Sequence, residues 1–221
     1  MARTKPAPAV APRFRRQRPE ARREDLIAAT LRCLREHGLE GVAVRRIAAE
    51  AGVSMGLINH YFPGSAGLIA ATYESLAGSM LEAMHEHVDR AGPDPRARLD
   101  AFIAAYFSPQ ALDSGTFRIW LVFWSLVAHS DEMRAIHDLT YARTRSTLEQ
   151  LLGELQAGSG AVRFDVRSAA IGLTALMDGL WVEMSLNATL IKPGEARALC
   201  EDWLQALLAK PPKPATARRR R

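Results

Sequence analysis

A four-residue corner, Ala51-Gly52-Val53-Ser54, constrains this chain more than any other stretch because it separates two short helical patterns. Helices are expected over about 44–51 and 55–61. Gly52 can end the first helix, because glycine turns the backbone with positive φ at no steric cost. Ser54 is a typical N-cap for the second helix. A third helical pattern precedes both, and the three together predict a helix-turn-helix.

In such a unit the second helix lies in the DNA major groove while the first braces it against the backbone. Buried Ile47 and Ile58 would fix the angle between them. On the exposed side, Asn59 can read adenine, and His60 and Tyr61 can reach phosphate or a base edge. The candidate DNA-binding residues are Arg22, Arg23, Val44, Arg45, Ser54, Met55, Gly56, Asn59, His60 and Tyr61.

The remaining chain also has helical periodicity, broken at Gly-Pro and Ser-Gly stretches, and it lacks the alternation typical of strands. The expected helices span about 21–37, 66–90, 96–107, 115–129, 131–156, 165–189 and 194–209. The pattern therefore predicts an all-α fold with an N-terminal helix-turn-helix unit and a larger helical bundle. The expected division is a disordered basic arm (1–19), a DNA-binding domain (20–66), a ligand-binding and dimerisation domain (67–209) and a disordered basic tail (210–221).

Charge is distributed unevenly: the net charge is +5, but the basic residues gather in the arm and the tail, so the body between them is acidic. Basic arms suit a polyanion such as DNA, or they serve only to keep the chain soluble. No apolar run approaches the length that crosses a bilayer, and no secretory leader is evident, which favours a soluble cytoplasmic protein. Cys33 and Cys200 have apolar neighbours and are expected to be core thiols. No metal, cofactor or catalytic motif is found, which argues against an enzyme.

The segment from Val44 to Phe62, V-R-R-I-A-A-E-A-G-V-S-M-G-L-I-N-H-Y-F, resembles the TetR family of bacterial transcriptional repressors. The resemblance implies a homodimer formed through the last two helices, a double-stranded DNA operator and a small-molecule effector. Two positions depart from the family: Ala43 replaces a usual Thr or Ser, and Ser65 replaces a usual Lys. An absent cap costs about 1 kcal/mol, so we expect the arm to supply part of the DNA affinity.

The larger domain carries two unusual helical stripes. One is aromatic, with Trp120, Phe123 and Trp124 on one face, and the other joins Thr174, Asp178, Trp181 and Ser185. We treat all seven as candidate ligand-binding residues, with Tyr106 or Tyr141 as further walls. A buried carboxylate needs a cation or hydrogen bonds. Its cation could be an arginine (Arg118, Arg143 or Arg145) or a ligand such as a quaternary ammonium, which aromatic faces also attract. The sequence leaves both open.

Further motifs resemble one branch of the same family, the choline-responsive repressors of glycine betaine synthesis. They are Trp-Leu-x-Phe-Trp at 120–124 and Asp-Gly-Leu-Trp at 178–181, with shorter matches in the N-terminal domain. The resemblance implies repression of genes for choline oxidation, relieved by choline. A repressor of efflux or other catabolic genes with a different ligand is the main alternative. An architectural DNA binder without an effector is another.

Overall fold

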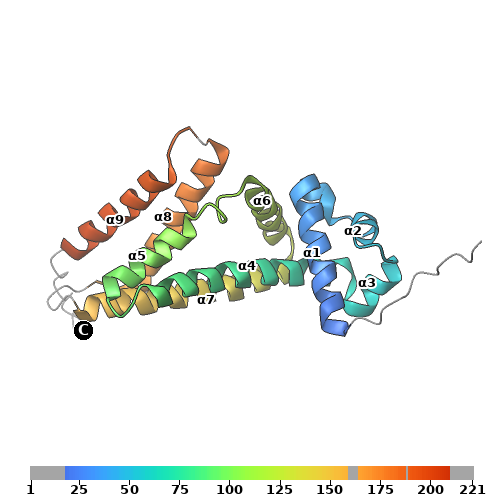
Figure 1. The fold of residues 1–221 in the computed structure, drawn as a ribbon, viewed down its shortest axis with the longest axis horizontal. Helices are drawn as coiled ribbons and strands as arrows, with labels where there is room; N and C mark the ends of the chain where they lie inside the picture. The colour runs from blue at the N-terminus through green and yellow to red at the C-terminus, as the bar shows by residue number, and fades with distance from the viewer. Residues whose placement is uncertain (1–17, 159–163, 188, 210–221) are drawn as a thin grey trace, which may run out of the picture.

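The computed structural model describes residues 18–158, 164–187 and 189–209, and this part of the chain is helical with no strands. It confirms the expected all-α fold. Three N-terminal helices form one end of the molecule, and a long helix leads away from them (Figure 1). The helices are α1 (Pro19–His37), η1 (Gly38–Val42), α2 (Val44–Glu50), α3 (Met55–Tyr61), α4 (Gly64–Arg90), α5 (Pro95–Tyr106), α6 (Ser114–His129), α7 (Asp131–Gly158), α8 (Val166–Leu186) and α9 (Pro193–Ala209). The helices that follow α4 form a bundle along it, in which α6 lies next to α1, whereas α5, α8 and α9 lie farther away (Figure 1).

The corner between α2 and α3 has the expected geometry. Gly52 has a φ of 64°, and the Ser54 side chain accepts a hydrogen bond from the Leu57 amide at 3.3 Å. Ile47 and Ile58 are fully buried beneath it. Local backbone chemistry and two apolar anchors therefore set the angle between the two helices.

The short 3-10 helix η1 was not expected from the sequence. It packs so closely on α1 that a Cβ on Gly41 would lie 2.4 Å from the Cys33 carbonyl oxygen. Only glycine fits this approach, which joins α1 to the start of α2. Helix periodicity could not show it, because five residues of 3-10 helix carry no repeating apolar pattern.

Helix α4 joins the two ends of the molecule, and α7 runs beside it (Figure 1). It begins at Gly64, two residues earlier than expected, where Gly64 has a positive φ of 72° after Pro63. One continuous apolar core runs from Leu26 in α1 to Leu204 in α9. The helix-turn-helix unit and the bundle are therefore packed together rather than merely tethered.

Helices α8 and α9 pack closely together: a Cβ on Gly172 would lie 3.0 Å from the Trp203 ring. Helix α8 ends at Leu186 rather than 189, because Asn187 leaves helical backbone geometry. Among described helices, α8 alone is long and apolar enough to cross a membrane by length and composition. The core helix of a soluble protein meets that criterion too, and Leu173 and Met177 of α8 are fully buried.

The predicted arm and tail lie almost entirely outside the described residues, apart from Arg18 and Pro19. Pro19 already belongs to α1, where its fixed φ suits the first helical turn. Cys33 and Cys200 are buried free thiols, as expected for core residues. Within the described ranges, no group of His, Cys, Asp or Glu side chains could hold a metal ion.

Candidate functional site

Helix α3 presents its polar residues to solvent. Met55, Gly56, Asn59 and His60 are exposed, whereas Ile58 faces the core. Tyr61 is half-buried, and its ring meets that of His60 edge to face at 5.1 Å. These side chains form the exposed side that a major groove would meet. Ser54 is also exposed, although its hydroxyl already caps α3.

The other candidates lie on α1 and α2. Arg23 donates a hydrogen bond to the Tyr61 carbonyl, and its guanidinium lies 4.2 Å from the centre of the Phe62 ring. It therefore braces the end of α3 against α1. Arg22 lies 3.7 Å from Asp25 on its own helix, while Arg45 is exposed.

The start of α2 shows the consequence of the Ala43 replacement. Its N-cap residue makes no side-chain hydrogen bond, whereas Ser54, Asp94, Asp113 and Asp165 cap their helices. Val44, the first residue of α2, is half-buried against the core. Backbone amides at this end of α2 remain available to a phosphate group.

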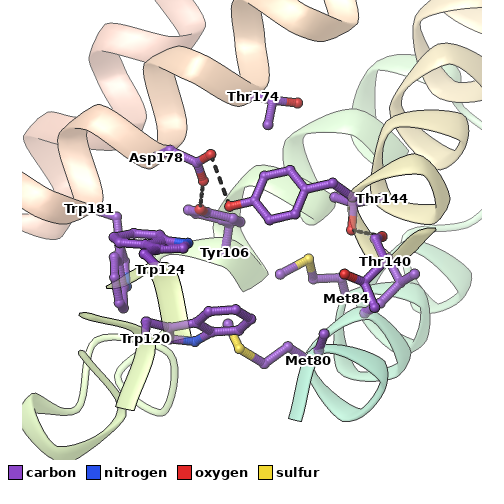
Figure 2. A pocket seen from close by; sticks show the side chains of 13 residues that line it. Met80, Met84, Tyr106, Trp120, Trp124, Thr140, Thr144, Thr174, Asp178 and Trp181 are labelled. Carbon is purple, nitrogen blue, oxygen red and sulfur yellow. Dashed lines mark hydrogen bonds between the residues drawn. The ribbon is translucent and has the colours of Figure 1, made fainter. Parts of the chain in front are cut away.

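A cavity lies in the bundle between α4, α5, α6, α7 and α8 (Figure 2). The centre of a water molecule could occupy a volume of about 60 Å³ inside this cavity. One water needs roughly 10–15 Å³ by this measure, so the space suits a small organic molecule. Its walls are Ala77, Met80, Leu81, Met84, Tyr106, Trp120, Trp124, Thr140, Tyr141, Thr144, Thr174, Asp178 and Trp181.

Among the described residues that line this cavity, Asp178 is the only carboxylate, and two phenols hold it. Tyr106 from α5 donates a hydrogen bond to Oδ1, and Tyr141 from α7 donates one to Oδ2 at 3.3 Å. No ion pair among the described residues involves Asp178. The phenols orient the carboxylate without neutralising it.

The possibility that an arginine balances Asp178 is wrong for at least two of the three candidates. Arg118 donates to the Arg35 carbonyl at 2.8 Å, and Arg143 lies 3.7 Å from Glu74. Both are on or near the surface, where water already solvates them. The charge in the cavity therefore has hydrogen-bond donors but no cation among its described partners.

Burial dominates the titration of this group. Desolvation raises the pKa of Asp178 above its ordinary value, although hydrogen bonds from Tyr106 and Tyr141 oppose the rise. Desolvation and the neighbouring carboxylate also raise the pKa of both phenols, so they remain neutral donors. Desolvation lowers the pKa of nearby His137, whose ring lies 4.2 Å from that of Tyr141. The cavity thus holds a carboxylate that a cation would stabilise.

Three tryptophans form the aromatic wall. Trp120 and Trp124 come from α6 with ring centres 6.3 Å apart, and Trp181 from α8 meets Trp124 edge to face at 5.9 Å. Their faces carry the negative end of the ring quadrupole, which attracts cations. Five of the seven candidate ligand-binding residues therefore meet at the cavity: Trp120, Trp124, Thr174, Asp178 and Trp181.

The structure does not bring Phe123 or Ser185 to this cavity. Phe123 is fully buried against Tyr73, with ring centres 4.9 Å apart. Ser185 lies one turn beyond Trp181 and donates to its carbonyl at 2.7 Å. Helical spacing puts Phe123 on the same face of α6 as Trp120 and Trp124, and Ser185 on the same face of α8 as Asp178 and Trp181. Each of these faces extends beyond the cavity.

The cavity walls from α4 and most of those from α7 were not predicted from the sequence. Met80 and Met84 close the cavity opposite Asp178, and Thr140 and Thr144 line its α7 side (Figure 2). The i, i+4 spacing of the two methionines was the available signal, but that pattern is equally typical of an ordinary core.

Comparison with known proteins gives two consecutive family matches. Residues 26–72 match "Bacterial regulatory proteins, tetR family", and residues 95–209 match "BetI-type transcriptional repressor, C-terminal". The HTH-type transcriptional regulator BetI of Burkholderia thailandensis is 35% identical over 190 residues, covering 86% of this chain and 95% of that protein.

Solved structures agree with this fold. A transcriptional regulator structure from Pseudomonas aeruginosa PAO1 is 41% identical, with a TM-score of 0.82, and the match covers 90% of this chain and 95% of that one. A regulator from Saccharomonospora viridis, solved in complex with choline, has a TM-score of 0.72 at 21% identity, with 85% and 97% coverage. At that identity the second match supports the fold alone.

Proposed function

The chain belongs to the TetR family of transcriptional regulators, with a BetI-type C-terminal domain, and we propose that it is a repressor released from DNA by choline. Regulators of this family are not enzymes. The proposed targets are genes that convert choline to glycine betaine, and the proposed location is the cytoplasm. The proposed effector rests on one observation: the carboxylate of Asp178 accepts hydrogen bonds from two phenols in a cavity lined by tryptophans.

The chemistry of the cavity favours a quaternary ammonium group. Such a group has no N–H, so it does not need a free hydrogen-bond acceptor, and both oxygens of Asp178 already accept from phenols. It needs a counter-charge and aromatic faces, which contribute up to about 2 kcal/mol each when water is excluded. Asp178, Trp120, Trp124 and Trp181 offer both.

Choline is the proposed ligand because it is a small member of this class and its hydroxyl could bond a threonine of the wall. Support comes from the BetI-type relatives and from the choline complex of the Saccharomonospora viridis regulator, which shares the fold. A repressor of efflux or other catabolic genes remains the alternative. This alternative would be favoured if a different ligand bound in the same cavity and its affinity did not change when Asp178 was replaced.

We propose that two copies dimerise through α8 and α9. The outer side of this pair exposes Ile171, Leu186, Leu190 and Leu199, each more than 40% accessible in the single chain. Ala175 and Gly179 are exposed beside them and would let a second helix approach closely. A dimer would also present two α3 helices to DNA about one helical turn apart, as palindromic operators require.

The experiment is a DNA-binding titration of the full-length protein by fluorescence anisotropy, using a duplex selected from a random library. Choline should weaken binding in a saturable way, and an uncharged isostere of choline, 3,3-dimethylbutanol, should not. If saturating choline leaves the DNA affinity unchanged, choline is not the effector, whereas the assignment as a transcriptional regulator stands.

A further inference from the structure

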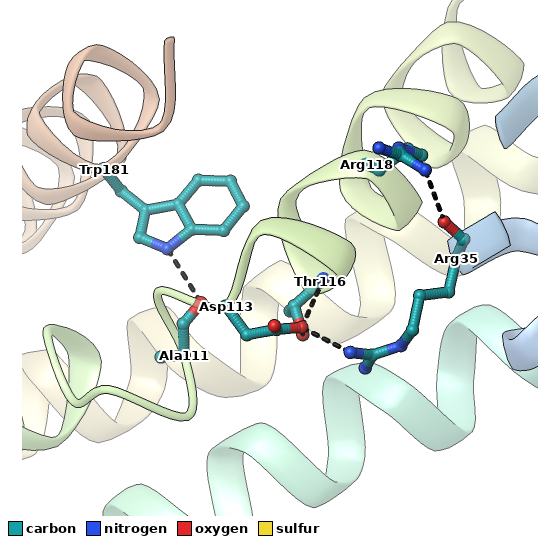
Figure 3. A network of polar contacts seen from close by, with 6 residues as sticks. All are labelled: Arg35, Ala111, Asp113, Thr116, Arg118 and Trp181. Atoms are coloured by element: carbon teal, nitrogen blue, oxygen red, sulfur yellow. Dashed lines mark hydrogen bonds and ion pairs between the residues drawn. The ribbon is translucent and has the colours of Figure 1, made fainter. Parts of the chain in front are cut away.

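We infer that Trp181, Asp113 and Arg35 form a clamp by which the occupant of the cavity controls the position of α1 in the DNA-binding domain. The inference rests on the proposed function for its regulatory consequence. Each contact in the clamp joins elements far apart in the sequence (Figure 3). The clamp is distinct from α4, which joins the two domains covalently.

The clamp begins in the wall of the cavity. The Trp181 ring lines the cavity, and its indole N–H donates to the Ala111 carbonyl at 3.1 Å in a buried hydrogen bond. The Trp181 side chain therefore contacts the cavity through its ring and, through its indole N–H, binds the segment between α5 and α6. A ligand that shifts the ring must also shift this segment or break a buried hydrogen bond, which is costly.

The held segment ends at Asp113, two residues after Ala111. A single carboxylate oxygen of Asp113 accepts from the Thr116 amide at 3.0 Å, which caps α6, and also from Arg35 of α1. The start of α6 and the end of α1 therefore share one anchor. Displacing the segment moves both.

Two further features fix Arg35 against α6. A Cβ added to Gly115 would lie 2.6 Å from Cγ and 2.8 Å from Nη1 of Arg35, so this side chain lies directly on the helix start. One turn later, Arg118 donates to the carbonyl of Arg35 at 2.8 Å and so holds the last turn of α1 (Figure 3). The domains thus meet through reciprocal arginine contacts.

Arg35 and Asp113 are each nearly half exposed, so their ion pair contributes little to overall stability. Its effect is positional: it makes the orientation of α1 depend on the α6 N-terminus. A weak contact suits such a role because a ligand can break it with a small part of its binding energy.

The first test needs no ligand. In hydrogen–deuterium exchange on the full-length protein, Trp181→Phe keeps an aromatic ring but removes the donor to Ala111. We expect faster exchange both at residues 111–117 and in the last turn of α1, residues 33–37. Trp124→Phe, which changes the same cavity without this bond, is the control. Faster exchange confined to the cavity or to 111–117 would overturn the clamp.

The second test measures regulation as the ratio of DNA dissociation constants with and without choline. Asp113→Asn keeps the α6 cap, because asparagine caps as well as aspartate, but loses the ion pair. Gly115→Ala displaces Arg35 without changing any charge. Each should reduce the ratio by about threefold, as expected from a modest contact, with choline affinity of the free protein unchanged.

Arg32→Gln is the matched control, because Arg32 pairs with Glu50 inside the DNA-binding domain at 2.6 Å. It should leave the ratio unchanged. An unchanged ratio in both clamp variants would contradict the inference. If the wild-type ratio is already one, choline is not the effector, and the exchange experiment alone decides the clamp.

Discussion

The DNA-binding end and the ligand cavity use polar residues in opposite ways. On α3, Asn59 and His60 face solvent, and the fold determines only where they point. In the cavity, Asp178 is half-buried and held by phenols from two other helices. Exposed side chains such as those on α3 can be changed without harm to the fold, whereas the partly desolvated carboxylate is a cost that a cation can offset. The difference fits the proposal that the bundle binds the effector and that α3 contacts DNA.

The largest expected effect comes from removing the charge of Asp178. Asp178→Asn should weaken choline binding by about 2 kcal/mol or more, roughly thirtyfold, because the cation loses its counter-charge in a desolvated site. DNA affinity without choline should not change. Isothermal titration calorimetry measures the first quantity and anisotropy the second. Asp138→Asn on the exposed side of α7 is the control, and equal losses in both variants would remove Asp178 from the site.

The phenols should determine which cations the cavity prefers. Tyr141→Phe frees one Asp178 oxygen, which a protonated amine can then use but choline cannot. The preference for choline over dimethylaminoethanol should fall by about fivefold, the value of roughly one hydrogen bond. Tyr73→Phe removes a phenol that bonds His137 at 2.9 Å instead, and it should leave the preference intact. A preference that survives in Tyr141→Phe would show that the phenols only support the fold.

Acidification should weaken choline binding and slightly stabilise the empty protein. Burial raises the pKa of Asp178, so the ionised form is a cost to the folded state that disappears as pH falls through that pKa. Choline needs the ionised form, so its affinity should fall over the same range, beginning above the ordinary value of about 3.9. Calorimetric titrations at successively lower pH, starting from neutral, measure this dependence.

His137 could contribute to the same trend, because its protonation would repel a cation. Desolvation lowers its pKa, so its contribution should come late in the titration. His137→Gln separates the two groups: the loss of affinity should persist in this variant and should vanish in Asp178→Asn. The reverse pattern would assign the pH dependence to the imidazole.

The smallest effects concern two arginines of the DNA-binding end. Arg45→Ala should reduce the slope of log DNA affinity against log salt concentration by about one unit, the value of one lost phosphate contact. Arg23→Ala should weaken binding with little change in that dependence, because Arg23 braces Tyr61 and Phe62. Anisotropy titrations at several salt concentrations distinguish them. A full unit of salt slope lost in Arg23→Ala would show that this residue reaches the phosphates after all.

The two regions also differ in how far the sequence predicts them. Gly52 and Ser54 could be placed because turn and cap chemistry acts over a few residues. Asp178 could be identified as unusual, but its partners come from α5 and α7, and only packing brings them together. Phe123 and Ser185 lie outside the cavity for the same reason: a helical stripe has a direction, but the length of the cavity along it depends on neighbouring helices.

If choline binding in the cavity and DNA binding by α3 are coupled, each ligand must change the affinity of the protein for the other. Choline affinity would be measured by calorimetry on the free protein and on the same protein saturated with DNA. We expect weaker choline binding to the DNA complex, by the same factor by which choline weakens DNA binding. Equal choline affinity in both states would contradict it, because two sites that do not affect each other's binding cannot form a switch.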